Sequence, residues 1–373
     1  MMQAAALNIG ARRAESSGLW ILAWRRFCRD RVGLVSLLIV VFFFGLMAAS
    51  GLHLIAADWS KEVGVNYAPP TFAGPAIPDG GPVARVAPDS SRGESKGETN
   101  PVDPLAGVLS EIRRSAGSGD IEIVDPLADV LAEIRAESRG ASVADAQAPT
   151  LVFGGDRWGR DVLLKTIKGT ETSMFVGLVA ALLAASLATV FGALAGYYGG
   201  WIDDLFNWFY SVFTSIPYLL LILAIAAVLN QKGTLTVILI LGLTGWTGIF
   251  RLVRAEYLKH KVREYIQAAD AIGASHVRRM FVHILPNVSH VILVQLSLHV
   301  VLFIKSEVVL SFLGFGVGVD TVSWGSMLNE AQNELILGYW WQLVAATIAM
   351  ALLVTGFSLF TDALRDALDP KLK

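Results

Sequence analysis

One stretch decides how this chain is interpreted: residues 264–287 read EYIQAADAIGASHVRRMFVHILPN. The pattern predicts a helix that ends near Gly273, a second short helix, and a stop at Pro286, because glycine favours a helix C-terminus and proline interrupts a helix. An apolar edge is predicted at Tyr265, Ile266 and Ile272. Such a helix pair suits docking to a partner protein. An amphipathic loop that lies in a membrane interface is the alternative.

Around this stretch the chain consists of long apolar blocks. It is 54% hydrophobic and 17% charged, which is too apolar for an ordinary soluble domain. A window of about twenty residues finds six apolar runs, at 32–57, 172–197, 205–229, 234–250, 288–313 and 341–359. The fourth run is the shortest, so a buried soluble helix is the alternative there. We therefore predict an all-α polytopic membrane protein with six transmembrane helices.

The basic residues predict how the chain is oriented, because cytoplasmic loops carry an excess of lysine and arginine. They cluster before the first run (Arg12, Arg13, Arg25, Arg26, Arg29, Arg31), after the fourth run (Arg251, Arg254, Lys259, Lys261, Arg263, Arg278, Arg279) and in the tail (Arg365, Lys371, Lys373). The loops after the third and fifth runs, on the opposite side, contain one basic residue between them, Lys232. Both termini are thus expected in the cytoplasm.

This orientation divides the chain into five parts. We expect a cytoplasmic tail at 1–31, a first transmembrane helix at 32–57 that serves as an uncleaved anchor, an extracytoplasmic loop at 58–171, a core at 172–362 that includes a cytoplasmic loop at 251–287, and a cytoplasmic tail at 363–373. Apolar residues at 19–27 share one helical face. They form either an interfacial helix or the aromatic and basic border of the first span.

The extracytoplasmic loop contains an insert at about 65–145. Its section at 69–100 is rich in Pro, Gly, Ser and charge, as is typical of a solvated linker. The sequence at 103–113 then returns at 125–135, and each copy predicts a small amphipathic helix. The repeat is either a tolerated duplication or a docking surface for a partner.

The stretch at 264–287 resembles the coupling loop of binding-protein-dependent ABC transporter permeases. The resemblance rests on Gln267-Ala-Ala, Gly273 and Ile284-Leu-Pro286. In that family the loop inserts into a cleft of the ATPase subunit, which implies coupling roles for Tyr265, Gln267, Ala268, Ala269, Gly273, Leu285 and Pro286. Gln267 stands where the family often has Glu, so a salt bridge from this position is not expected.

Further motifs resemble the C-type membrane subunit of the peptide/nickel (oligopeptide and dipeptide) permeases. They are GDRWGRDV at 155–162, GYYGGWID at 196–203, SIP at 215–217, SFLGFG at 311–316, SWG at 323–325 and LRDALDP at 364–370. The resemblance implies the type I ABC importer permease fold, with six transmembrane helices and a long external loop between the first two. It also implies transport of peptides or related solutes across the bacterial inner membrane.

The chain has no Gly-x-x-x-x-Gly-Lys-Ser/Thr loop that could cradle a nucleotide phosphate. ATP and Mg are thus expected on partner subunits, with no catalytic residue and no cofactor on this chain. The resemblance implies a homologous B-type permease, two ATP-binding subunits and an extracytoplasmic solute-binding protein as partners. No basic nucleic-acid-binding pattern is present. The spacing of His283, His290 and His299 does not favour a metal site.

Three residues are candidates for the translocation path. Lys305 and Glu307 are ionisable residues within the fifth run, and such charges normally face a protein interior or a cavity. They either meet the charged ends of a zwitterionic peptide, form a local structural pair, or extend to the interface. Pro217 predicts a kink in the third run, which either moves with gating or serves packing.

Two other classes of function compete with this interpretation. An ion-coupled secondary transporter would need no ATPase and usually has acids near the membrane midplane and inverted repeats. An intramembrane hydrolase would need a nucleophile and a base within the bilayer. Only the importer subunit accounts for the helix–Gly–helix pattern at 264–287. Co-purification with two ATP-binding subunits would discriminate among the three.

Cys28 is the only cysteine of the chain and precedes the first run, so it reports on orientation. We expect it to resist membrane-impermeant thiol reagents in intact spheroplasts and to react, if at all, only after permeabilisation. A cysteine at Ser118 in a Cys28→Ser background is expected to label from outside. The reverse pattern of labelling would invert the predicted topology.

Overall fold

The computed structural model describes residues 24–74, 147–318 and 320–368, and these ranges are helical without an extended strand. The tandem repeat, and the tail before residue 24, lie outside the described residues. The helices are α2 (Arg31–Gly51), η1 (Thr71–Ala73), α5 (Val162–Tyr198), α6 (Gly200–Thr214), α7 (Tyr218–Leu229), α8 (Thr234–Thr244), α9 (Thr247–His260), α10 (Glu264–Ala271), α11 (His276–Arg278), η2 (Arg279–Ile284), α12 (Leu285–Phe312), α13 (Trp324–Ile336) and α14 (Trp341–Leu368).

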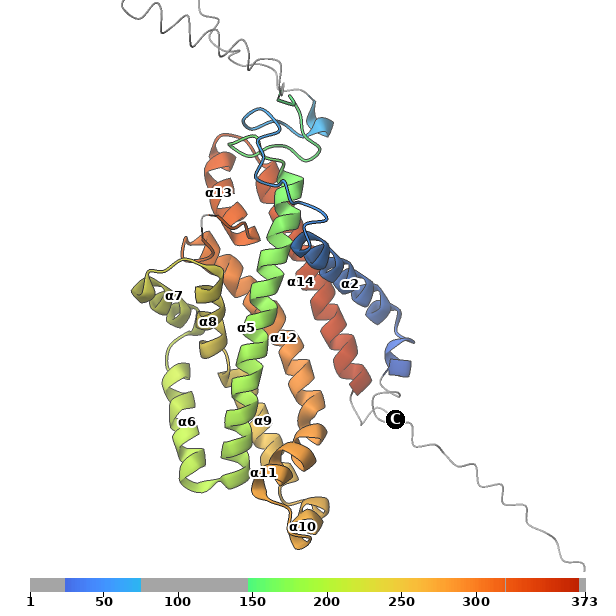
Figure 1. Cartoon of the computed structure of the whole chain (residues 1–373), viewed down its shortest axis with the longest axis vertical. Helices are drawn as coiled ribbons and strands as arrows, with labels where there is room; N and C mark the ends of the chain where they lie inside the picture. Colours follow the sequence, from blue (N-terminus) through green and yellow to red (C-terminus); the bar gives the residue numbers. More distant parts are fainter. Residues whose placement is uncertain (1–23, 75–146, 319, 369–373) are drawn as a thin grey trace, which may run out of the picture.

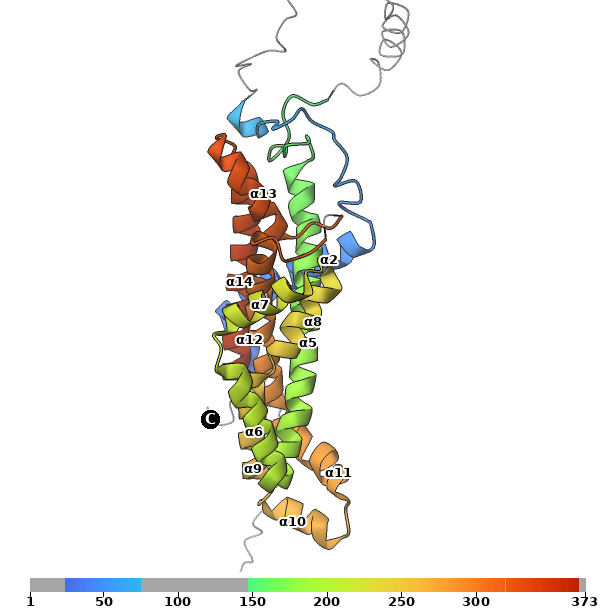
Figure 2. The same cartoon turned by 90° about the vertical axis from the view of Figure 1, so that its left-hand side faces the viewer.

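Helix α5 runs through the middle of the bundle and contacts α2, α6, α8, α9, α12, α13 and α14 (Figures 1 and 2). It begins at Asp161, whose side chain accepts hydrogen bonds from the backbone N–H groups of Leu163 and Leu164. Its 37 residues span about 55 Å at ~1.5 Å per residue. Because the hydrocarbon core of a bilayer is about 30 Å thick, α5 extends beyond it.

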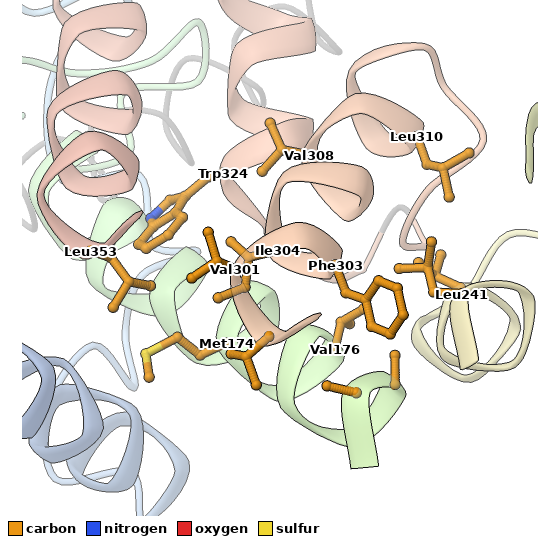
Figure 3. Packing of buried hydrophobic residues seen from close by; sticks show 14 of the residues in the cluster. Met174, Val176, Leu241, Val301, Phe303, Ile304, Val308, Leu310, Trp324 and Leu353 are labelled. Carbon is orange, nitrogen blue, oxygen red and sulfur yellow. The ribbon is translucent and has the colours of Figure 1, made fainter. Parts of the chain in front are cut away.

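Small residues let other helices approach α5 closely. Ala180, Ala184 and Ala188 are fully buried on it. At Gly196 an added Cβ would lie 2.6 Å from the carbonyl oxygen of Arg254 on α9. Figure 3 shows the same core nearer the other end, where Met174 of α5 lies among side chains of α12, α13 and α14. Close approach through small residues is how transmembrane helices associate when lipid removes the hydrophobic driving force.

Within the described ranges, four continuous helices are long and apolar enough to cross a membrane, and there are up to six spans if each bent helix pair counts as one. The four are α2, α5, the helix at 276–312, and α14. The predicted spans at 205–229 and 234–250 each correspond to one bent helix pair. The first is split into α6 and α7 with a bend of 84°, and the second into α8 and α9 with a bend of 40°.

Pro217 explains the sharper break. It precedes α7 with φ −52° and ψ 128°, an extended conformation that ends the helical path. Proline also lacks the N–H that would continue the hydrogen-bond ladder from α6. The kink predicted at Pro217 is thus confirmed, and it is a complete reorientation of the helix rather than a bend within one.

Two loop segments close one end of the bundle, and they flank residues 75–146. Isolated β-bridges pair Gly64 with Ala148 and Pro70 with Leu151. Gly159 allows this contact, since its φ is +75° and an added Cβ would overlap the carbonyl oxygen of Gly64. The chain therefore leaves this end of the bundle and returns to it at neighbouring points.

The two ends of the bundle differ in what they carry. We call the end with α13, the start of α5 and the two paired loops the α13 end, and the end with α10 and α11 the α10 end (Figure 1). Helix α13 lies between α12 and α14 in the chain and starts with a reciprocal cap between Ser323 and Ser326. It is not one of the candidate spans.

Replacing Gly196 tests the contact of α5 with α9. Gly196→Ala is expected to destabilise the protein by about 1–3 kcal/mol, because the new methyl group would collide with backbone atoms of α9. Gly45→Ala on α2 is the matched control, since an added Cβ there meets nothing within 4 Å. Thermal unfolding of the two purified variants in detergent measures the difference. Equal melting temperatures would contradict close packing at Gly196.

Candidate functional site

The stretch at 264–287 projects from the α10 end as a short helix pair (Figure 1). Helix α10 ends two residues before Gly273, which has φ +82°. Ser275 then caps α11 by accepting a hydrogen bond from the backbone N–H of Arg278 at 3.3 Å. The predicted first helix and the turn at Gly273 are therefore confirmed, and a second helix begins after Ser275.

The predicted stop at Pro286 is wrong. Helix α11, the π-helix η2 and α12 form one continuous helix over 276–312. Pro286 is the second residue of α12, and Leu285 alone separates it from the six-residue π-helix. Proline is tolerated there because the wider turn of the π-helix just before it changes the hydrogen-bond spacing, so the missing N–H and the ring of Pro286 are accommodated.

The residues expected to couple to an ATPase fall into two groups. Most of them are exposed on the projecting pair, namely Tyr265, Gln267, Ala268 and Gly273. Ala269 is buried beneath them, and Ile266, expected on the apolar edge, is buried as well. Leu285 and Pro286 lie instead at the start of α12. Ala268, rather than Ala269, is thus available to a partner.

Side-chain contacts fasten the projecting pair to the bundle. The hydroxyl of Tyr265 lies 2.9 Å from Nδ1 of His260 on α9. Arg279 forms an ion pair with Asp270 of α10 at 2.5 Å. The hydroxyl of Tyr257 donates to the carbonyl oxygen of Met280 at 3.1 Å. The pair is therefore held in place although its surface is open.

Exposed apolar side chains lie on both sides of Ala268 in the sequence. Ile272 is 84% exposed, Val262 64% and Val277 61%. The sequence pattern had indicated Ile272 but not the two valines, which lie outside the helix from which the apolar edge was predicted. Together they give the α10 end an apolar surface outside the bundle, of the kind that partners cover.

The three candidate path residues are not brought together as one group. Lys305 is exposed and Glu307 is fully buried, and no ion pair joins them. Instead, Glu307 accepts hydrogen bonds from the hydroxyls of Ser173 on α5 at 2.8 Å and Ser311 at 2.6 Å. Pro217 stands at the break between α6 and α7. Glu307 thus fastens α12 to α5.

A buried ionic network at the α13 end was not predicted from the sequence. Lys165 of α5 is 1% exposed, and its ammonium group donates to Asp156 at 2.7 Å and to Glu330 of α13 at 2.5 Å. It also reaches Gln342 of α14 at 3.4 Å. A buried ammonium needs such partners, because an unpaired buried charge is strongly destabilising. The only sequence signal was the position of Lys165 in the first turn of α5, ahead of Lys168 and Glu171 and of the long apolar part of the helix.

Glu334 of α13 lies next to this network. It is 2% exposed, and one of its carboxylate oxygens accepts from the backbone N–H of Arg157 at 3.3 Å. Burial raises the pKa of Glu334 to about 7, although the charge of Lys165 opposes the shift. Its other carboxylate oxygen has no hydrogen-bond partner among the described residues.

Comparison with known proteins identifies the family. Residues 188–373 match the profile of the binding-protein-dependent transport system inner membrane component, and residues 18–70 match the N-terminal transmembrane domain of oligopeptide transport permease C. The dipeptide transport system permease protein DppC of Bacillus subtilis is 39% identical over 221 residues, which cover 59% of this chain and 69% of that protein. The chain belongs to this family of permeases.

Two further relatives, OppC and GsiD, agree with this membership. The oligopeptide transport system permease protein OppC of Bacillus subtilis is 36% identical over 221 residues, which cover 59% of this chain and 72% of that protein. The glutathione transport system permease protein GsiD of Pectobacterium atrosepticum is 35% identical, with coverages of 59% and 73%. A chain of the inward-facing MetNI methionine ABC transporter aligns with a TM-score of 0.37 and 16% identity, over 50% of this chain and 96% of that one.

Family membership confirms the resemblance drawn from the ordered motifs. With the helical structure, it also confirms the expected fold class, an all-α polytopic permease. The profile at 188–373 includes the projecting pair and most of the bundle, and the profile at 18–70 includes α2. Neither profile includes residues 71–187, which contain the insert and most of α5.

The raised pKa of Glu334 predicts that stability depends on pH. A buried acid with a raised pKa binds its proton more tightly in the folded state, so the folded state loses stability as the pH rises from about 4.5 to about 7. Between pH 5 and pH 7.5, we expect the free energy of unfolding to fall by about 2 kcal/mol less in Glu334→Gln than in the unaltered protein. Thermal unfolding of both proteins at the two pH values measures this. Parallel pH profiles would contradict the assignment.

Proposed function

We propose that this permease forms half of the translocation path of an ATP-driven importer for peptides or related small peptidic solutes. The relatives named above carry dipeptide, oligopeptide or glutathione transport in their names. The chain lies in the bacterial inner membrane with both termini in the cytoplasm. The basic residues at the α10 end support this orientation, since cytoplasmic surfaces of membrane proteins are rich in them.

The rest of the importer is supplied by partners. A homologous B-type permease completes the path, and an extracytoplasmic solute-binding protein delivers the solute at the α13 end. Two ATP-binding subunits hold ATP and Mg and carry out hydrolysis. This chain contributes no catalytic residue, and its part in the cycle is mechanical.

The observation that carries the proposal is the projecting helix pair with its open apolar surface. We call residues 264–287, which form this pair, the coupling loop. Ala268 is exposed and has a small side chain, so the backbone of a partner can approach it closely. Ile272 and Val277 offer side chains that can enter a pocket of the partner. Burial of these side chains upon docking would contribute on the order of 1 kcal/mol or more each.

The geometry suits the transmission of motion from the ATPase into the membrane. The second helix of the coupling loop is the start of one 37-residue helix over 276–312. A shift of the docked loop would therefore move α12 as a unit, and the contact of Glu307 with Ser173 would pass the shift to α5. The break at Pro217 allows α6 and α7 to move relative to each other.

Ala268→Arg tests the docking surface. The variant is expected to insert and fold normally, because Ala268 is exposed, but to lose association with the ATP-binding subunits, because the long charged side chain prevents close approach. Co-purification in detergent and ATPase activity in proteoliposomes measure the loss, which we expect to exceed tenfold.

Ala255→Arg is the matched control. Ala255 is also exposed but lies on α9, outside the helix pair, and we expect this variant to retain the ATP-binding subunits. Normal association and transport by Ala268→Arg would contradict the proposed docking surface.

A further inference from the structure

Two adjoining cavities lie at the α13 end, beside the network of Lys165. The larger has a volume of about 310 Å³ and the smaller about 210 Å³. Trp59, Thr321 and Val322 line both, so the cavities meet along a shared wall. Together they fall within the range of ligand-binding pockets, about 300–1,000 Å³.

The larger cavity is positively charged. Its wall includes Arg157, Arg160 and Lys232, and none of the three forms an ion pair with a described residue. Lys165 also lines it, and its two partners Asp156 and Glu330 outnumber that ammonium group by one charge, which is fewer than the three unpaired cations. The cavity therefore has an uncompensated positive charge, which favours an anion.

Arg160, which lines this cavity, has a hydrogen-bond donor that no described residue uses. Its Nε is buried and has no partner among the described residues. The guanidinium carbon lies 5.7 Å from the ring centre of Trp59, a distance at which the cation and the ring attract each other. A buried donor without a partner is costly, and a carboxylate is the group that a guanidinium binds best, through two parallel hydrogen bonds.

The smaller cavity carries the opposite charge. It is lined by Glu171 and Asp320, together with Lys168 and the ring of Phe175. Lys168 is paired with Glu171 at 2.7 Å. Asp320 is exposed and forms no ion pair with a described residue, so one negative charge is left over. An ammonium group is the complementary ligand.

We propose that the two cavities form one binding site for a short zwitterionic peptide. The carboxylate of the peptide binds at Arg160 in the larger cavity, its ammonium group binds near Asp320 in the smaller one, and Trp59 lies between them. This inference rests on the proposed import of peptides. It places the recognition of the charged ends at the α13 end rather than at Lys305 and Glu307, which line neither cavity.

Calorimetry with matched peptides tests the site on the purified full chain in lipid nanodiscs. The probes are trialanine, trialanine amide, which lacks the carboxylate, and N-acetyl-trialanine, which lacks the ammonium group. We expect trialanine to bind, and each modified peptide to bind at least tenfold more weakly.

Substitutions then assign each end of the peptide to its cavity. We expect Arg160→Gln to bind trialanine and trialanine amide equally well but N-acetyl-trialanine more weakly. We expect Asp320→Asn to bind trialanine and N-acetyl-trialanine equally well but trialanine amide more weakly. Lys259→Gln, at an exposed position of α9, is the matched control and should bind all three peptides as the unaltered chain does. Should Arg160→Gln fail to fold, Lys232→Gln provides a second variant in the larger cavity.

Two results would overturn the proposal. One is that trialanine does not bind, or that its binding does not depend on free ends in the manner described. The other is that Arg160→Gln leaves peptide binding unchanged but weakens association with the solute-binding protein, which would assign the positive cavity to an acidic side chain of that protein. Recruitment of ATP-binding subunits by the coupling loop is measured separately, so failure of the site would leave the permease role standing.

Discussion

The close approach of other helices to α5 is the constraint on which the rest of the structure depends. In lipid, helices gain little from hiding apolar surface from each other, so contact at short range has to hold them. The alanine and glycine face of α5 supplies that contact to α9 and α12. A buried lysine secures one end of the same helix and the contact with α9 lies towards its other end, so both ends of the permease share one rigid element.

The polar groups of the bundle serve this arrangement. Glu307, enclosed by Ser173 and Ser311, ties α12 to α5, and Lys165 ties α5 to α13 and α14. Both groups have hydrogen-bond partners within the bundle, as buried polar groups require. The two ends of the bundle differ from this interior. The coupling loop has exposed apolar side chains, and the two cavities have charged side chains without ion-pair partners among the described residues. The interior is thus closed and the two ends are open to partners.

The sequence predicted the features that local patterns determine. The apolar runs showed where helices lie, and Gly273 showed where the projecting helix ends. Tertiary context decided the rest. Pro286 continues a helix because a π-helix precedes it, and Pro217 breaks a span completely. Lys165 and Glu330 are 165 positions apart, so no local pattern could pair them. Lys305 and Glu307 are two positions apart on a helix, a spacing at which side chains do not face each other.

The paired loops at the α13 end have a consequence for how this gene can change. Bridges from Gly64 to Ala148 and from Pro70 to Leu151 fix the points at which the chain departs and returns. Closing a loop between fixed neighbouring points costs only about 0.6 kcal/mol more for each doubling of its length. Mutations that lengthen or shorten the DNA between these codons therefore meet little selection from the folding of the bundle. The same position is a natural place to graft a reporter domain whose own termini lie close together.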